Sequence, residues 1–262
     1  MTGRTLPPRA DLELADQAPS RLARWLIRTS SWGAYDHSRL EFRRRIVKWV
    51  GIHVIFPLTV KIAGASGLEN LPPSGSALLM FNHIAFVDPL VIMCLLPRSV
   101  VPLAKEEVFG NLFLAFFPWI YKVIPVHRGD VDRRALRMAL QVLQSGEVVL
   151  LAPEGTRSPS LLPGKEGVAY LAARTGSPVV PVAVEGTEGF PTFRRERWRG
   201  PGASIRLGRP FRFSVDAARP DRLLLRKMTD EALYVLASML PPQRRGAYTD
   251  LSRATQETIE FL

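Results

Sequence analysis

The sequence predicts an α/β fold: a layered domain with a largely parallel central sheet flanked by helices, preceded by a helical N-terminal segment. Three observations support this prediction. Short apolar runs alternate with stretches of helical character, as in chains of parallel crossover units. Hydrophobic residues make up 47% of the 262 residues, which is ample for a buried core. Polar, charge-bearing loops directly follow three of the apolar runs.

Four regions divide the chain. Residues 1–20 are polar, contain proline and lack the apolar centre of a secretory signal, so we expect a loose tail and a protein that stays on the cytoplasmic side. Residues 21–60 form the helical N-terminal segment, residues 61–240 the α/β domain, and residues 241–262 a C-terminal tail without clear pattern.

The N-terminal segment combines basic and aromatic residues with an apolar end. Residues 21–49 predict one or two basic helices that carry tryptophan, and residues 50–60 (VGIHVIFPLTV) are almost wholly apolar. The apolar part is too short for a membrane span, which needs about 20 residues, and Pro57 interrupts it. Such a segment suits a helix that lies in a membrane interface. Packing of the same segment on the core is the alternative, and the sequence leaves both open.

The α/β domain is predicted from alternating elements. Residues 132–146 are a clear amphipathic helix that ends at Gly146, whereas residues 106–123 are unusually apolar. Because Phe113, Phe116, Phe117 and Trp119 are more than one core face requires, we expect residues 108–121 to contact a membrane as well. The predicted strands lie within residues 61–73, 76–81, 99–104, 123–128, 147–153 and 177–184, and the predicted helices cover 88–96, 106–123, 132–146, 164–176 and 219–240.

Charge and cysteine content limit the function classes. Lys and Arg number 35 against 24 Asp and Glu, so the net charge is +11 and anionic partners are expected: phosphorylated substrates, acidic lipid headgroups or nucleic acid. The single cysteine, Cys94, excludes an intramolecular disulfide and a multi-cysteine metal site. The four histidines show no HExxH pairing, so we expect no metal.

The stretch NHIAFVDP places His83 five residues before Asp88. On one helix this spacing is a rotation of about 500°, which would send the two side chains to different faces. An apolar strand precedes the pair, and Asp88-Pro89 is typical of a helix start, so we expect a turn between them. A turn would let Asp88 accept the Nδ1 proton of His83 and leave Nε2 as a base. The alternative is that Asp88 only caps the helix.

Further charged residues follow other predicted strands. Because ligands bind at the carboxyl ends of strands in open α/β sheets, we expect these loops to converge with His83. The glycine allows close backbone approach, and the arginines can each grip a phosphate through a bidentate fork. Taken singly, each residue is more simply explained as part of a solvated loop, a turn or a solvated helix start. The candidates are Lys105, Arg128, Glu154, Gly155, Thr156, Arg157, Lys165 and Gly167.

Together these motifs resemble, in order, those of the glycerolipid acyltransferase family, which includes bacterial 1-acyl-sn-glycerol-3-phosphate acyltransferases. The resemblance covers about residues 60–215, and Ala152 departs from it where Phe often precedes PEGTRS. The matching residues are Asn82, His83 and Asp88 (NHxxxxD), Arg128, Pro153 to Ser158 (PEGTRS), Lys165 and Gly167, and Val180 to Val182.

The resemblance implies an enzyme that moves a fatty acyl group from acyl-CoA or acyl-carrier protein to the sn-2 hydroxyl of 1-acylglycerol-3-phosphate, giving phosphatidic acid. His83 would be the general base and Asp88 would orient it, with no cofactor. The acceptor and donor would be bound by Asn82, Lys105, Arg128, Glu154, Gly155, Thr156, Arg157, Lys165 and Gly167. The enzyme would work as a peripheral or monotopic protein on the anionic cytoplasmic face of the cell membrane, with no nucleic acid as partner.

Three other interpretations remain. The acceptor is a different one, such as glycerol-3-phosphate or another lysolipid; or His83 activates water and the protein is a thioesterase. The third is a basic nucleic-acid- or membrane-binding protein without catalysis, for which residues 194–200 (RRERWRG) are the best support. Only the catalytic interpretations require His83 for activity.

Overall fold

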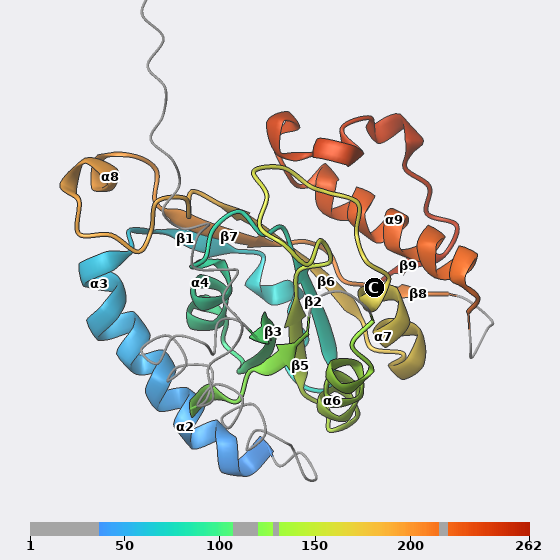
Figure 1. Ribbon diagram of the computed structural model, residues 1–262, viewed down its shortest axis with the longest axis horizontal. Coiled ribbons are helices and arrows are strands. Elements are labelled where there is room, and N and C mark those ends of the chain that lie inside the picture. The colour runs from blue at the N-terminus through green and yellow to red at the C-terminus, as the bar shows by residue number, and fades with distance from the viewer. Residues whose placement is uncertain (1–36, 107–119, 128–130, 215–219) are drawn as a thin grey trace, which may run out of the picture.

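A mostly parallel sheet runs through the centre of the molecule (Figure 1). The computed structural model describes residues 37–106, 120–127, 131–214 and 220–262. Within these ranges nine strands form one sheet, with the main order β1-β7-β6-β2-β5-β3-β4. The strands are β1 (Ile62–Ser66), β2 (Ala77–Phe81), β3 (Val100–Lys105), β4 (Ile124–Val126), β5 (Val148–Leu151), β6 (Val179–Glu185), β7 (Ala203–Leu207), β8 (Phe211–Phe213) and β9 (Ile259–Phe261).

The direction of the strands puts the carboxyl ends of five of them at one edge. These five, β6, β2, β5, β3 and β4, run parallel to one another, whereas β7 and β8 pair antiparallel to β6 and β9 pairs antiparallel to β8. Strand β1 pairs parallel to β7, so its first residue lies at the edge where β6 ends. The predicted α/β class with a largely parallel sheet is confirmed.

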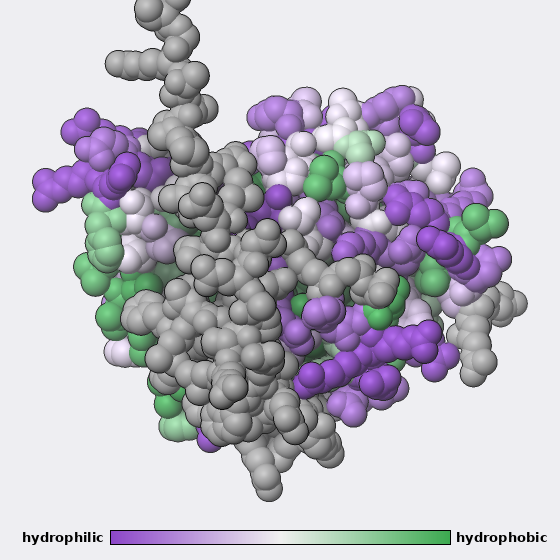
Figure 2. All heavy atoms as spheres, in the orientation of Figure 1, coloured by the Kyte–Doolittle hydropathy of each residue, from purple (hydrophilic) through white to green (hydrophobic). Residues whose placement is uncertain are grey.

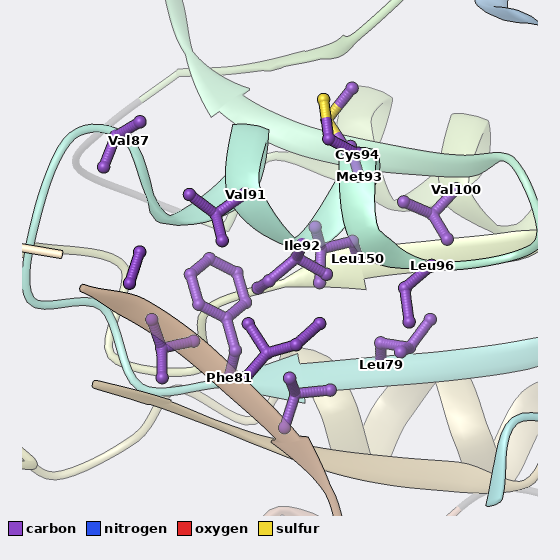
Figure 3. Close-up of a cluster of buried hydrophobic side chains, with 14 of the residues drawn as sticks. Leu79, Phe81, Val87, Val91, Ile92, Met93, Cys94, Leu96, Val100 and Leu150 are labelled. Carbon is purple, nitrogen blue, oxygen red and sulfur yellow. The ribbon is translucent and has the colours of Figure 1, made fainter. Parts of the chain in front are cut away.

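Helices cover both faces of the sheet, which explains why β2 and β5 are fully buried apolar runs without alternation. On one face α4 packs on β2, where Val91 and Ile92 meet Leu79 and Phe81 (Figure 3). On the other face α6, α7 and α9 enclose a second apolar cluster around Leu78. The helices are α2 (His37–Val50), the π-helical turn η2 (Gly51–Ile55), α3 (Phe56–Thr59), α4 (Asp88–Leu95), α6 (Arg133–Gln144), α7 (Gly167–Thr175), α8 (Arg195–Arg199) and α9 (Arg222–Ser238).

The N-terminal segment is one unbroken helical run from residue 37 to residue 59. Pro57 does not interrupt it, and the proline lies in α3, which directly follows the π-helical turn η2. One side packs on the domain: Arg44 is buried and donates to the Tyr121 carbonyl, and Gly51 lies against the Cys94 sulfur. No helix among the described residues is long and apolar enough to cross a membrane.

The other side of this run exposes large apolar side chains, which appear as a green margin in Figure 2. Phe42 is 72% exposed, Trp49 58% and Leu58 61%. We call this set, with Ile46, Val54 and Ile55, the apolar stripe. One face of the helical segment therefore packs on the core, as one of the two interpretations predicts, and the opposite face is apolar and exposed.

Most predicted elements are present with shifted ends, and some were missed. Residues 107–119 lie outside the described ranges, and they include most of the stretch 108–121 for which a membrane contact is predicted. The sequence did not predict α8, β7, β8 or β9. These elements are short, and the three strands lie on the antiparallel side of the sheet.

The C-terminal segment differs from the predicted tail, because it is built into the fold. It forms the short 3₁₀ helices η5 (Pro242–Arg244), η6 (Gly246–Tyr248) and η7 (Leu251–Arg253), followed by β9. The buried carboxylate of Glu231, on α9, holds it: one oxygen accepts from Thr255 Oγ1 at 2.7 Å and the Glu257 amide at 3.1 Å, and the other from the Thr258 amide at 2.9 Å and its hydroxyl at 2.6 Å. Burial raises the pKa of Glu231, but these hydrogen bonds outweigh it and lower the pKa overall.

We expect Glu231→Gln to destabilise the fold by about 1–3 kcal/mol at neutral pH, because an amide leaves one backbone N–H facing an NH₂ group. Because the pKa of Glu231 is lower in the folded protein than its unfolded value of 4.5, the ionised carboxylate stabilises the fold above that pH. This stabilisation is lost as the pH falls. The difference in the free energy of unfolding between the variant and the wild type should therefore become smaller in acid. Urea unfolding at both pH values measures it, with the exposed Glu260→Gln as control. Equal stability of both variants at neutral pH would contradict the anchoring role.

Candidate active site

A tight turn between β2 and α4 brings His83 and Asp88 together. His83 Nδ1 lies 2.8 Å from Asp88 Oδ2, and the same oxygen accepts the amides of Ile84 at 2.7 Å and Ala85 at 2.8 Å. The Asp88 side chain is fully buried, whereas that of His83 is 20% exposed. Among the described residues the Asp88 carboxylate bonds to no amide of its own helix, because Oδ2 bonds back to the turn and Oδ1 has no hydrogen-bond partner. The turn is as predicted, and the alternative in which Asp88 only caps the helix is wrong.

This contact determines which tautomer of the neutral imidazole fits the turn. An ionised carboxylate can only accept, so the neutral tautomer that fits has its proton on Nδ1 and a free lone pair on Nε2. The two backbone amides hold Asp88 Oδ2 in place before any substrate arrives. The Phe81 ring supports the imidazole, with 5.3 Å between the ring centroids. A proton taken at Nε2 would be stabilised by the buried negative charge behind Nδ1.

Asn82 fixes the end of β2 rather than facing a ligand. It is buried, its Nδ2 donates to the Val184 carbonyl at 2.9 Å, and its Oδ1 accepts the Val184 amide at 2.8 Å. The side chain thus continues the hydrogen-bond ladder between β2 and β6. The prediction that Asn82 contacts substrate does not fit this placement, since both of its polar atoms are used inside the sheet.

The PEGTRS loop after β5 forms hydrogen bonds with both the carbonyl and the amide of His83. The Ser158 amide donates to the His83 carbonyl at 2.8 Å, and the His83 amide donates to Glu154 Oε1 at 3.3 Å. The other carboxylate oxygen of Glu154 accepts the Leu162 amide at 3.0 Å. Glu154 is therefore a buried support for this turn. Burial raises the pKa of Glu154 to about 7, although the two amide hydrogen bonds act in the opposite direction.

Gly155 and Lys165 form the accessible part of this loop. Gly155 has a φ of +66°, and a Cβ there would lie 3.3–3.5 Å from the Lys165 side chain, so the lysine crosses close over the glycine. The Lys165 amide donates to the Pro153 carbonyl at 2.8 Å, which fixes this arrangement. Arg157 is exposed and Thr156 is half-buried beside them. The loop therefore exposes the cationic side chains of Arg157 and Lys165 and the backbone of Gly155 to solvent next to His83.

The remaining predicted residues are less closely tied to this site. Lys105 is the last residue of β3, so it lies at the same edge of the sheet. Gly167 begins α7, where a Cβ would meet nothing within 4 Å, so no steric need for glycine is visible. Arg128 lies outside the described residues. Among the described residues no group of three or more His, Cys, Asp or Glu could hold a metal ion.

A support that the sequence did not predict comes from the C-terminal segment. The Leu161 amide donates to the Arg244 carbonyl at 2.9 Å, and the Ala247 amide donates to the Leu161 carbonyl at 3.0 Å. Arg244 Nη1 also donates to the Pro159 carbonyl at 2.9 Å. Gly246 has a φ of +51°, and a Cβ there would lie 2.1 Å from the Leu161 oxygen. Residues 244–247 therefore clamp the chain directly after PEGTRS, a contact that no local motif signals.

Comparison with known proteins identifies relatives. Residues 64–185 match the family model described as Acyltransferase. A 1-acyl-sn-glycerol-3-phosphate acyltransferase of Bacillus subtilis is 27% identical over 163 residues, covering 62% of this chain and 80% of the relative. The alpha form from Mus musculus is 27% identical over 185 residues, covering 68% and 63%. The chloroplastic BAT2 enzyme of Brassica napus is 32% identical over 159 residues, covering 58% and 45%. The chain thus spans less than two thirds of the last two.

A solved structure supports the fold. The 1-acyl-sn-glycerophosphate acyltransferase PlsC of Thermotoga maritima superposes with a TM-score of 0.55 at 24% identity, over 83% of this chain and 86% of that one. The likeness is one of architecture. The resemblance to glycerolipid acyltransferases that the ordered motifs predict is confirmed by the family match and the relatives.

We expect Glu154→Gln to destabilise the fold by about 1–3 kcal/mol in mild acid, since an amide can accept only one of the two backbone N–H groups. A folded pKa raised from 4.5 to about 7 gives stability that is present at low pH and lost as the pH rises. The neutral variant lacks this loss, so its deficit in the free energy of unfolding should shrink between about pH 4.5 and pH 7 and stay constant above that range. Chemical unfolding across this pH range measures the difference in the free energy of unfolding between Glu154→Gln and wild type. The exposed Glu69→Gln is the control. A deficit that does not change with pH would contradict the raised pKa.

Proposed function

We propose that this chain, a relative of the 1-acyl-sn-glycerol-3-phosphate acyltransferases, is itself such an enzyme. It transfers a fatty acyl group from acyl-CoA or acyl-carrier protein to the sn-2 hydroxyl of 1-acylglycerol-3-phosphate and releases phosphatidic acid. The observation that carries the proposal is the 2.8 Å contact between His83 and the buried Asp88, at the carboxyl edge of a parallel sheet. A base held in this way suits removal of a proton from an alcohol.

The reaction needs one base and one activated acyl group. His83 Nε2 takes the proton of the sn-2 hydroxyl as the oxygen attacks the thioester carbonyl carbon, and Asp88 stabilises the imidazolium that forms. The tetrahedral intermediate then collapses: the carbon–sulfur bond breaks, and the thiolate recovers the proton from His83. The products are the diacyl phosphate and the free thiol, so protons and electrons balance. The hydroxyl of the substrate takes the place that a serine holds in a catalytic triad.

The acceptor phosphate is assigned to the open side of the PEGTRS loop. Arg157 is exposed there, Lys165 lies over Gly155, and both cations are on the loop that holds the His83 backbone. A bidentate arginine with a nearby lysine is well suited to a phosphate monoester. Arg128 joins this set through the family resemblance alone. Glu154 and Asn82 serve in this proposal as supports and do not touch the substrate.

A membrane surface is the third part of the proposal, because both lipids carry long acyl chains. The apolar stripe along α2, η2 and α3 is exposed, and the exposed Arg43 and Arg45 lie on the same helical run. Apolar and aromatic side chains with basic neighbours are typical of a helix that lies in an anionic interface. We therefore place the enzyme on the cytoplasmic face of the cell membrane as a peripheral or monotopic protein.

The first test is thiol release from acyl-CoA by the detergent-solubilised protein, with and without 1-acylglycerol-3-phosphate. Release should require the acceptor and should fall by at least about 10³-fold in His83→Ala. Asp88→Asn should cost about 10²–10⁴-fold, because the neutral amide cannot stabilise the imidazolium. A fold check by circular dichroism accompanies both variants.

The same assay separates the alternatives. Release without acceptor that is lost in His83→Ala would replace the proposal with a thioesterase. Release that requires glycerol-3-phosphate or another lysolipid would keep the chemistry and change the acceptor. Absence of release with both acyl-CoA and acyl-carrier protein would overturn the catalytic proposal.

A second test concerns the acceptor phosphate. Removing one charge-assisted bond costs about 1.5–3 kcal/mol, so Arg157→Gln and Lys165→Gln should raise the acceptor KM by about 10- to 100-fold. We expect little change in kcat at saturating acceptor. Turnover of 1-monoacylglycerol, which lacks the phosphate, is the control and should not respond to either substitution. Equal losses on both acceptors would place the two cations elsewhere in the reaction.

A further inference from the structure

The loop between β6 and β7 extends from the edge of the sheet that carries His83. It comprises residues 186–202, includes α8, and is here called the α8 loop. Asn82 joins the end of β2 to Val184 near the end of β6, so the loop begins close to the catalytic turn. In Figure 1 it lies beside the end of α3, and in Figure 2 it forms a strongly hydrophilic projection next to the green margin.

Internal contacts make this loop stiff. The Arg197 guanidinium donates to the carbonyls of Glu188 at 2.5 Å, Gly186 at 2.6 Å and Pro201 at 2.6 Å. It also lies over the Phe190 ring, 4.0 Å from the centroid. The loop therefore has one defined shape although it contains only one short helix, and holding that shape costs little further entropy on binding.

The α8 loop is also fastened to the end of the N-terminal helical run. The Thr192 amide donates to the Thr59 carbonyl at 2.8 Å. Lys61 Nζ donates to the carbonyls of Trp198 and Gly200, both at 3.0 Å. Leu58 of the apolar stripe directly precedes Thr59, and Phe193 directly follows Thr192. The loop is thus a rigid extension of the surface that carries the stripe.

The outward side of the loop has the chemistry of an interface. Phe193 is 78% exposed, and the neighbouring Arg194, Arg195 and Arg199 are exposed as well. Within the described part of the chain these three guanidinium groups form no salt bridge. One exposed phenylalanine is ordinary. An exposed phenylalanine that is followed by exposed arginines, on a loop bonded to the end of the helical run that carries the apolar stripe, is typical of binding to anionic lipid.

We propose that the α8 loop is a second membrane contact, in which Phe193 enters the interface and Arg194, Arg195 and Arg199 bind lipid phosphates. This inference rests on the proposed function. A helix that lies on a bilayer through one stripe can still roll about its own axis. The α8 loop lies off that axis, so a second contact there stops the roll and fixes the angle at which the His83 edge meets the lipid headgroups.

Binding of the full chain to sedimenting vesicles tests the proposal. On vesicles of phosphatidylglycerol and phosphatidylcholine in equal parts, Arg194→Gln/Arg195→Gln should weaken partitioning by about fivefold for each arginine. Phe193→Ala should weaken it by about five- to tenfold. On pure phosphatidylcholine only Phe193→Ala should have an effect. The matched controls are Leu223→Ala, an 82% exposed leucine on α9, and the exposed pair Arg212→Gln/Arg253→Gln.

Activity then separates this inference from the proposed function. On a short-chain 1-acylglycerol-3-phosphate dissolved as monomers the loop variants should turn over like wild type, whereas on acceptor held in anionic vesicles they should lose activity in step with partitioning. Variants that bind vesicles as wild type does would overturn the membrane contact. If they instead lose turnover only with acyl-carrier protein as donor, the loop binds that acidic protein. Inactivity of wild type on the monomeric acceptor would contradict the proposed function while the binding result still stands.

Discussion

One buried oxygen, Oδ2 of Asp88, sets the geometry on which the site depends. A carboxylate removed from water is costly unless donors replace its hydration, and here the donors are His83 Nδ1 and the amides of Ile84 and Ala85. These three donors point at the same Asp88 oxygen only when residues 83–88 form this turn. The turn in turn fixes where β2 ends and where α4 begins, so the charge that would assist the base also organises the local fold.

The imidazole is held by segments far apart in the chain. Its side chain is fixed by the local turn, but its backbone bonds reach 71 residues ahead to Glu154 and also to Ser158. The loop that carries those partners is clamped by residues 244–247, and Asn82 ties the neighbouring strand end to Val184. The His83 imidazole is therefore rigidly held, whereas the cations assigned to the acceptor phosphate, Arg157 and Lys165, stay accessible.

Sequence reasoning succeeded where the signal is local. The strands β2 and β5, the helix α4 and the His83–Asp88 turn follow from short apolar runs, an Asp-Pro helix start and a five-residue spacing. It failed where the information is a pairing between distant residues. Nothing near Asn82 indicates that its amide completes a ladder with a residue 102 positions away, and nothing near Glu154 indicates two backbone amides as partners. For the C-terminal segment the sequence predicts a tail, because 3₁₀ turns have no hydrophobic period. The residue that anchors this segment, Glu231, has the same sequence context as any acidic residue on a helix.

The clamp of residues 244–247 on Leu161 has a consequence for how the enzyme matures during synthesis. A nascent chain that has emerged from the ribosome as far as α9 already contains the catalytic turn and the PEGTRS loop. It still lacks the partners of the Leu161 amide and carbonyl. The loop assigned to the acceptor phosphate is thus held in place only after residues 244–247 have emerged, whereas the His83–Asp88 turn has all its hydrogen-bond donors much earlier.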